Sequence, residues 1–160
     1  MLYPARMQPK PGDLLEDFTL PDQDGNPVTL SQFKGSPLVL FFYPRADTPG
    51  CTIEACGFRD QFAKLKKSGA IVLGISRDTV KAQKKFAEKY DIQYPLLADA
   101  DEMLIKRFDL LRNKTMYGKP VTGVARTTFL IGPNRTLLHV FENVKPEGHA
   151  EEVLAFLKKK

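Results

Sequence analysis

Pro37-Leu-Val-Leu-Phe-Phe-Tyr43 runs directly into Pro44-Arg-Ala-Asp-Thr-Pro-Gly-Cys51, and this junction organises the whole chain. The first part is apolar throughout, without alternation, which predicts a strand that is buried on both faces. Thr48 is a good N-cap, and Pro49 suits the first helical position, where a missing N–H costs nothing. We therefore expect a buried strand that leads into a helix from about Thr48 to Lys67.

The residues after this junction continue the alternation of helix and strand. The stripe of Ala55, Phe58, Phe62 and Leu65 has the spacing of one helix face, and Ser68-Gly69 ends the helix. The further elements expected are a strand over 70–76, a helix over 78–90 capped by Asp78, a strand over 94–98, a short helix over 101–108 capped by Asp101, an irregular stretch over 109–125, strands over 126–131 and 136–141 joined as a hairpin, and a last helix over about 146–158.

The order of the elements indicates the fold class. Near the N-terminus, Phe18-Thr-Leu20 and Val28-Thr-Leu30 flank a turn-rich segment, which predicts a hairpin. Strands that alternate with helices, followed by a hairpin and a closing helix, predict an α/β fold: a central mixed sheet with helices on both faces. This is the element order of a thioredoxin-like fold with an extra N-terminal β-hairpin. We expect one domain over residues 1–160, with residues 1–10 as a flexible extension.

The net charge of +5 raises the question of nucleic-acid binding. The cations, however, lie on separate predicted helix faces within 64–67, 81–85 and 158–160, and no aromatic residues interleave with them for base stacking. The longest apolar run has the length of a strand, whereas a membrane helix needs about 20 residues. The first residues lack the apolar centre of a signal peptide. We expect a cytoplasmic protein that binds neither nucleic acid nor a membrane.

Both cysteines of the chain lie within Cys51-Thr-Ile-Glu-Ala-Cys56. A secreted disulfide framework has more cysteines at wider spacings. Zinc takes about four ligands, and His139 and His149 stand far away in the sequence without metal-ligand spacing. No metal or other cofactor is therefore expected, and two close thiols in a reducing compartment indicate redox chemistry.

Cys51 falls in the first turn of the predicted helix. Unpaired backbone N–H groups and the positive end of the helix dipole stabilise an anion there, and the thiolate is the reactive form of cysteine. The alternative is a small apolar residue packed in a turn, because free cysteines are often buried. The position at the helix start and the presence of a second thiol together favour a nucleophile.

Cys56 lies five positions further along the same predicted helix. In an ideal helix the two Cα atoms are about 8.6 Å apart and on different faces, whereas a disulfide needs Cα atoms within about 7 Å. The two thiols cannot bond while the helix is intact, so a disulfide between them would require unwinding. Gly50 and Gly57 flank the pair and weaken the helix, by about 1 kcal/mol each relative to alanine.

The motif Pro44-Arg-Ala-Asp-Thr-Pro-Gly-Cys51 resembles that of the peroxiredoxins, which have Pro, three residues, Thr, two residues and Cys. The continuation Thr52-Ile-Glu-Ala-Cys56-Gly-Phe-Arg59-Asp60 is similar to the bacterioferritin-comigratory-protein (Q) subfamily. The likeness extends through Leu73-Gly-Ile-Ser76, Met116-Tyr-Gly-Lys119 and Arg126-Thr-Thr-Phe129, and thus over nearly the whole chain. Only the N-terminal end and the lysine tail fall outside it.

The resemblance implies a role for each matching residue. Cys51 corresponds to the peroxidatic cysteine, which attacks the peroxide, and Cys56 corresponds to the resolving cysteine. Thr48 corresponds to the hydroxyl that hydrogen-bonds peroxide and thiolate. Pro44 corresponds to the residue that shields the pocket from water, and Arg126 to the arginine that reaches the sulfur from a distant strand.

Taken alone, three of these residues also fit structural roles. Thr48 could be only an N-cap, Pro44 only a strand terminator, and Arg126 only a surface charge at the start of a strand. For Arg126 the residue pattern favours neither role, and the resemblance carries the assignment. Glu54 and Arg59 either join the network around the sulfur or pair with other charges on the helix surface.

The resemblance also implies a function: reduction of hydrogen peroxide and organic hydroperoxides through a Cys51 sulfenic acid, which Cys56 resolves as an intramolecular disulfide. Thioredoxin or a glutaredoxin-like dithiol is the expected reductant, and a monomer is the expected state. One rival function is that of a dithiol–disulfide oxidoreductase acting on proteins, which would be expected to carry Cys-x-x-Cys. The other is a basic nucleic-acid-binding domain or a holdase chaperone, for which no recognised motif is present.

Overall fold

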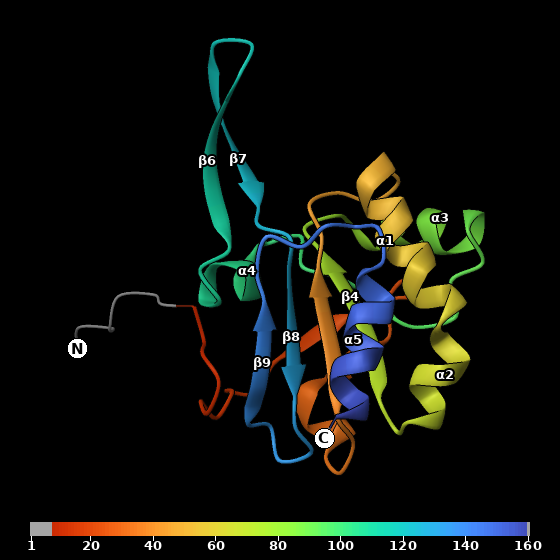
Figure 1. Cartoon of the computed structure of the whole chain (residues 1–160). Coiled ribbons are helices and arrows are strands. Elements are labelled where there is room, and N and C mark those ends of the chain that lie inside the picture. The colour runs from red at the N-terminus through yellow and green to blue at the C-terminus, as the bar shows by residue number, and fades with distance from the viewer. Residues whose placement is uncertain (1–7, 160) are drawn as a thin grey trace.

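The computed structural model describes residues 8–159, and a five-stranded sheet forms its centre (Figure 1). The strands lie in the order β5-β4-β3-β8-β9. β3 is parallel to β4 and β4 to β5, whereas β8 is antiparallel to β3 and to β9. The sheet is therefore mixed, as predicted. Its strands are β3 Leu38–Phe42, β4 Ile71–Ser76, β5 Leu96–Ala98, β8 Thr127–Ile131 and β9 Leu137–Phe141.

β3 is the middle strand of this sheet, and all its residues are buried. Its backbone pairs with β4 on one side and with β8 on the other. Because protein also covers both faces, no position along the strand faces water. This environment explains the unbroken apolar run over 37–43 and confirms the buried strand predicted there.

Alternate residues of β3 point to opposite faces of the sheet, and each face has its own apolar core. Val39 and Phe41 pack in one core with side chains from α1, α2, α3 and α5. Leu40 and Phe42 pack in the other with side chains from α4 and the N-terminal hairpin. Helices on both faces and the extra hairpin confirm the predicted architecture (Figure 1). The elements are α1 Pro49–Asp60, α2 Phe62–Lys67, α3 Val80–Lys89, α4 Met103–Arg107, α5 His149–Lys158, the hairpin strands β1 Thr19–Pro21 and β2 Pro27–Thr29, and a 3₁₀ helix, η1 Leu30–Phe33.

The helix expected over 48–67 is divided in two. α1 ends at Asp60 and α2 begins at Phe62, with Gln61 between them at φ −97° and ψ 5°. Backbone hydrogen bonds still cross the break, from the Gln61 N–H to the Gly57 oxygen and from the Leu65 N–H to the Gln61 oxygen. A break of one residue leaves the apolar side chains on the side of the sheet, so the sequence pattern shows no interruption.

The predicted cap of α3 is wrong by one residue. The helix is capped by Thr79, whose hydroxyl accepts the Ala82 N–H at 3.2 Å. The Asp78 carboxylate instead accepts hydrogen bonds from the Ala46 N–H and the Ser76 hydroxyl, at 2.8 and 2.6 Å. Asp78 thus ties the loop after β3 to the end of β4, a task that depends on tertiary contacts and not on local sequence.

The predicted cap of α4 is wrong as well. Asp101 does not cap the helix. The N-cap position is Glu102, whose side chain makes no capping bond, and the Asp99 Oδ2 instead accepts the N–H groups of Leu104 and Ile105 at 3.0 and 2.8 Å. Several acidic residues precede this helix, and each is a good capping residue by type. Asp99 is chosen because it directly follows β5, which is fixed in the sheet.

The stretch over 109–125, predicted to be irregular, contains an antiparallel hairpin of β6 Leu111–Met116 and β7 Lys119–Val124. It projects from the body of the molecule (Figure 1). Nearly all its residues are partly or fully exposed, so no buried face imposes the alternation that marks a strand. At its tip, Tyr117 and Gly118 have positive φ angles of 53° and 76°, as in the tight turns that join such strands.

The N-terminal end is described only in part. Residues 1–7 lie outside the described residues, and so does most of the extension predicted over 1–10. Of the predicted extension, residues 8–10 are described, and there the Gln8 Nε2 donates a hydrogen bond to the Glu142 Oε1 at 2.8 Å. Between residues 8 and 159, no helix has the length and apolar character needed to cross a membrane.

Candidate active site

Cys51 lies where the chain, having left the middle strand, enters α1. Thr48 has an extended backbone, with φ −95° and ψ 157°, and Pro49 is the first helical residue, so Cys51 is in the first turn. Its side chain is 0% exposed, and its thiol is free. The predicted position of Cys51 at a helix start is confirmed.

Arg126 is the cation that meets the sulfur. Its Nη1 lies 3.5 Å from the Cys51 Sγ, within hydrogen-bonding distance of a sulfur atom. The next residue, Thr127, pairs with Phe42 at the end of β3, which places Arg126 beside the loop that leads to α1. The Arg126 side chain is only 17% exposed. This burial does not fit the alternative interpretation of Arg126 as a solvated surface charge.

Gly50 leaves space for this arginine. A Cβ atom at position 50 would lie 3.0 Å from the Arg126 Nη2 and 3.3 Å from the Pro146 Cγ, closer than such atoms normally approach. The guanidinium therefore passes directly over the first turn of α1. Besides weakening the helix, Gly50 gives the positive charge access to the sulfur.

Glu54 holds the same guanidinium. It lies one helical turn after Cys51, is 1% exposed, and accepts a hydrogen bond from the Arg126 Nη1 at 2.8 Å. Burial raises the pKa of Glu54 to about 7, against the lowering effect of Arg126. Its Oε2 is buried without a hydrogen-bond partner among the described residues. Of the two roles left open for Glu54, the structure therefore supports membership of the network around the sulfur.

Arg126 remains charged in this environment. Burial acts to lower its pKa, but the Glu54 carboxylate and the Cys51 sulfur outweigh that effect, so the pKa of Arg126 is raised. A fixed positive charge therefore lies beside the Cys51 Sγ. The helix start and the arginine thus both present positive charge to the sulfur.

Thr48 and Pro44 lie in the loop before α1. The Thr48 hydroxyl donates to the Arg45 carbonyl oxygen at 2.8 Å, and its side chain makes no capping hydrogen bond to the helix. Thr48 is therefore the N-cap by position, but the capping bond expected of its side chain is not formed. Pro44 is partly buried and follows Tyr43, the first residue after β3. Thr48 directly precedes the helix that carries Cys51, and Pro44 lies at the other end of the same loop.

Cys56 lies in the same intact helix as Cys51, is partly exposed, and is also a free thiol. Burial raises its pKa, while the nearby Arg59 acts in the opposite direction. The Arg59 guanidinium contacts the Asp60 carboxylate at 2.9 Å and donates to the Tyr90 carbonyl oxygen at 2.7 Å. Arg59 is thus a neighbour of Cys56 and pairs with surface groups, unlike Glu54.

Glu54 is the site residue that the sequence left undecided. A signal for it exists, because residues three apart lie on the same side of a helix, and Glu54 is three residues after Cys51. Helix spacing cannot identify the partner of Glu54, because Arg126 directly precedes β8, which is far away in the sequence. Separately, the described part of the chain holds no group of three or more His, Cys, Asp or Glu side chains that could bind a metal ion.

The chemistry that this arrangement allows is that of a nucleophilic sulfur. A buried free thiol in the first turn of a helix, 3.5 Å from a guanidinium nitrogen, is placed to act as a nucleophile. Cys56 supplies a second thiol, which can accept the oxidised sulfur if the helix opens. Together with the fold, the site defines the class: a thiol-based oxidoreductase with a thioredoxin-like architecture.

Comparison with solved structures supports this class. A bacterioferritin comigratory protein from Xanthomonas campestris, studied for its alkyl peroxide reduction activity, superposes with a TM-score of 0.84. It is 41% identical in sequence, and the match covers 89% of this chain and 90% of that one. A mutant of Xylella fastidiosa PrxQ superposes with a TM-score of 0.89 at 40% identity, covering 93% and 95% of the two chains.

Comparison with known sequences gives the family. The model of the AhpC/TSA family matches residues 11–140. Peroxiredoxin Bcp of Escherichia coli K12 is 43% identical, over 93% of this chain and 96% of its own length. The putative peroxiredoxin bcp of Coxiella burnetii is 44% identical, over 88% and 93%. The chain therefore belongs to the AhpC/TSA family as a peroxiredoxin, a thiol-dependent peroxidase that acts on peroxide and is recycled by a thiol.

Proposed function

We propose that Cys51 is the thiol that attacks the peroxide and that Cys56 resolves the oxidised product. The observation that carries this proposal is the 3.5 Å contact between the Arg126 Nη1 and the Cys51 Sγ in the first turn of α1. The positive charge that stabilises the thiolate also stabilises the negative charge that develops on the departing oxygen. In this proposal Arg126 therefore stabilises the thiolate before the attack and the departing oxygen during it.

Thr48 and Pro44 complete the peroxide site in this proposal. The Thr48 hydroxyl donates a hydrogen bond to the Arg45 carbonyl oxygen, so its own oxygen is available to accept a hydrogen bond from the peroxide O–H. Pro44 offers no N–H to water and covers the loop with an apolar ring. The position of Thr48 directly before α1, and that of Pro44 in the loop that leads to it, support these roles.

The first step is an attack by the Cys51 thiolate. An S–O bond forms to one peroxide oxygen while the O–O bond breaks, and sulfur supplies the electron pair. The second oxygen leaves as hydroxide or alkoxide and takes up a proton, which gives water or an alcohol. The product on the protein is the Cys51 sulfenic acid.

The second step requires α1 to open. The Cys56 sulfur attacks the sulfenic sulfur, an S–S bond forms, and the hydroxyl leaves as water. Cys51 is fully buried, and both cysteines lie within α1, about 8.6 Å apart by ideal helix geometry. Disulfide formation therefore unwinds at least the first turn and moves Cys51 away from Arg126.

Thioredoxin or a glutaredoxin-like dithiol is the proposed reductant, and the proposed working state is a cytoplasmic monomer. Two thiols in one helix need no residue from a second subunit, which supports the monomer. A cycle that passes through free thiols needs a reducing compartment, which supports the cytoplasm. We include organic hydroperoxides among the substrates because the Xanthomonas campestris relative was studied for alkyl peroxide reduction.

The test is peroxide consumption with dithiothreitol as reductant, measured for wild type, Cys51→Ser and Cys56→Ser. Cys51→Ser should fall to the background rate, because the attacking atom is gone. Without reductant, Cys56→Ser should consume one peroxide per chain and stop at the sulfenic acid; with dithiothreitol it should turn over, because the external thiol reduces the sulfenic acid. Peptide mapping of oxidised wild type should find Cys51 linked to Cys56 within one chain.

Two outcomes would contradict the proposal. If Cys51→Ser kept most of the wild-type activity, the attacking group would have to be sought elsewhere. If mapping found the disulfide between two chains, a dimeric enzyme would replace the mechanism of helix unwinding. Urea unfolding of each variant checks that a lost activity does not reflect a lost fold.

A further inference from the structure

The β6–β7 hairpin carries an exposed aromatic tip. Tyr117 is 97% exposed and Met116 is 54% exposed, and Val121 adds an exposed apolar side chain on β7. Tyrosine and methionine are enriched in protein–protein interfaces, where they bring large contact areas. Because the hairpin projects from the body of the molecule (Figure 1), these side chains are held where a partner can reach them.

The same hairpin is positively charged. Arg112, Lys114 and Lys119 are its only charged residues, since no acidic residue occurs between positions 111 and 124. All three are exposed. A cationic surface attracts an acidic partner and repels a second copy of itself, and lysines on exposed strands oppose pairing of one strand edge with another. The charge therefore favours an acidic partner over self-association.

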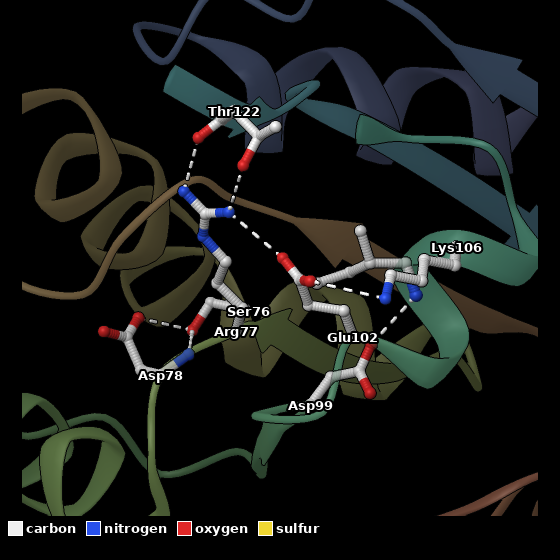
Figure 2. A network of polar contacts seen from close by, with 8 residues as sticks. Ser76, Arg77, Asp78, Asp99, Glu102, Lys106 and Thr122 are labelled. Atoms are coloured by element: carbon white, nitrogen blue, oxygen red, sulfur yellow. Dashed lines mark hydrogen bonds and ion pairs between the residues drawn. The ribbon is translucent and has the colours of Figure 1, made fainter. Parts of the chain in front are cut away.

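A polar network fixes the hairpin to the body of the protein (Figure 2). The Arg77 guanidinium, just after β4, donates to the Thr122 carbonyl oxygen at 2.6 Å and to its hydroxyl at 3.2 Å. It also contacts the Glu102 carboxylate at 3.1 Å, which in turn lies 3.8 Å from the Lys106 Nζ of α4. A two-stranded hairpin alone is only marginally stable in water, so these contacts set the direction in which it projects.

The hairpin is joined directly to the active site. β7 ends at Val124, and Arg126, which contacts Cys51, follows two residues later. In Figure 1 the hairpin projects from the same end of the sheet at which α1 begins. A protein bound to the hairpin is therefore held at the same end of the sheet as the helix turn that carries the reactive sulfur (Figure 1).

We propose that the β6–β7 hairpin is the docking arm for the dithiol protein that reduces the Cys51–Cys56 disulfide, and that it binds an acidic, partly apolar surface of that protein. This inference rests on the function proposed above. One partner thiolate attacks the disulfide, which breaks the Cys51–Cys56 bond and forms a mixed disulfide. The second partner thiol then displaces the peroxidase, which recovers two thiols while the partner is oxidised by two electrons.

The experiment compares a reductant that needs docking with one that does not. Reduced thioredoxin, regenerated by its reductase, serves as the protein dithiol, and dithiothreitol serves as the small one. With K114E/K119E, kcat/KM for thioredoxin should fall at least about tenfold and lose its salt dependence. Peroxide turnover with dithiothreitol should stay within about twofold of wild type, because neither lysine belongs to the catalytic site.

Two further variants sharpen the comparison. K66E/K67E reverses two exposed lysines on α2 and makes the same change in net charge away from the hairpin. It should leave kcat/KM for thioredoxin within about twofold of wild type. Tyr117→Ser should lower kcat/KM for thioredoxin while the salt dependence remains, since it removes contact area and no charge.

The outcomes that would overturn the docking proposal are distinct from those that would contradict the peroxidase mechanism. Equal losses in K114E/K119E and K66E/K67E would reduce the effect to net charge and end the proposal. A wild type that turns over with dithiothreitol but not with thioredoxin would also end the proposal, and so would a K114E/K119E variant with an unchanged kcat/KM for thioredoxin. Failure of the wild type to consume peroxide with every reductant would remove the proposed function itself.

Discussion

Arg126 uses one nitrogen atom for two partners. Its Nη1 lies 2.8 Å from the Glu54 Oε1 and 3.5 Å from the Cys51 Sγ. Glu54 holds the guanidinium in place, and the same positively charged group lies against the sulfur. Removal of Arg126 alone would leave a buried, unpaired carboxylate, which strongly destabilises a fold. The effect of the arginine on the reaction is therefore best measured with that carboxylate neutralised.

We expect Arg126→Ala, made in a Glu54→Gln background, to slow peroxide attack at least tenfold, or about 1.4 kcal/mol of activation free energy. The reason is the loss of the positive charge beside the thiolate and the departing oxygen. Stopped-flow oxidation of the Cys51 thiolate measures this step alone. Arg59→Ala is the matched control and should stay within about twofold of wild type, because Arg59 contacts Asp60 and Tyr90. An attack rate unaffected by Arg126→Ala would leave this residue a purely structural role.

The Glu54 carboxyl links stability to pH. Its pKa in the folded protein is about 7 because of burial, whereas an unfolded glutamate has a pKa near 4.3. The folded state therefore holds the proton more tightly, and the free energy of unfolding falls as the pH rises from about 4.3 to about 7. We therefore expect the free energy of unfolding of the wild type to fall by about 2.5 kcal/mol between roughly pH 5 and pH 8, relative to that of Glu54→Gln.

Urea unfolding of wild type and Glu54→Gln at the two pH values measures this loss. Glu88→Gln, which neutralises an exposed carboxylate on α3, should follow the wild type across the same range. If the free energy of unfolding changed by the same amount in wild type and Glu54→Gln, Glu54 would be ionised at both pH values. Arg126 would then fully offset the effect of burial on the Glu54 pKa.

Cys51 and Arg126 differ in how far the sequence alone could place them. Local signals place Cys51: an apolar run, an N-cap residue and a proline fix the helix start within a few positions. Nothing local places Arg126, because its contact with the sulfur arises from the pairing of β8 with β3, in which Thr127 lies opposite Phe42. Pairing between distant strands is a property of the whole sheet, and here only the family resemblance anticipated its result.

At the level of elements, α1 is the scaffold of the site, and in the proposed mechanism it also opens. Intact, it holds Cys51 against Arg126 and keeps Cys56 on another face. We expect hydrogen exchange over residues 50–59 to be faster in the disulfide form than in the dithiol form, because a disulfide cannot span the intact helix. Mass spectrometry of the two forms measures the exchange.

α3 provides the internal reference for this measurement, since it packs on the same face of the sheet and contains no cysteine. Its exchange should be equal in the two redox forms. Cys56→Ser treated with peroxide gives the second control: it forms the sulfenic acid without a disulfide, and α1 should stay protected. Full protection of α1 in the disulfide form would show that the bond forms without unwinding and would refute the geometric argument.

The elements differ in how readily a sequence pattern predicts them. Elements with a buried face, such as β3, β4 and α3, are predictable because burial imposes a period on their apolar residues. The hairpin of β6 and β7 has no such face, and its strand character comes from pairing alone. The sequence predicts caps at Asp78 and Asp101, whereas Thr79 and Asp99 make the capping hydrogen bonds. Nearby residues have the same capping ability, and only contacts with other elements decide between them.

For the molecule as a whole, the site depends on two apolar cores that share the central sheet. Phe41 belongs to the core beneath α1, where its ring stacks on Phe58 at a centroid distance of 4.5 Å. Phe42 belongs to the opposite core, where its ring meets Phe129 at 5.6 Å. Because Cys51 itself packs in the first of these cores, a change in sheet packing is transmitted to the position of the reactive sulfur.

Gly74 in β4 is a point of close packing in the sheet, and it pairs with Phe41 of β3 and with Leu96 of β5. A Cβ atom there would lie 2.9 Å from the Leu96 Cδ2 and 2.9 Å from the Phe41 Cζ. Phe41 cannot yield without displacing α1, so we expect Gly74→Ala to cost about 1–3 kcal/mol and to lower the thermal midpoint by about 3–9 °C. Gly57→Ala is the matched control, since its added methyl would meet only the Ala150 Cβ, at an ordinary 3.7 Å, and should not destabilise the fold. Equal unfolding free energies for Gly74→Ala and wild type would mean that the sheet and α1 separate freely, which would contradict a rigid packing of Cys51.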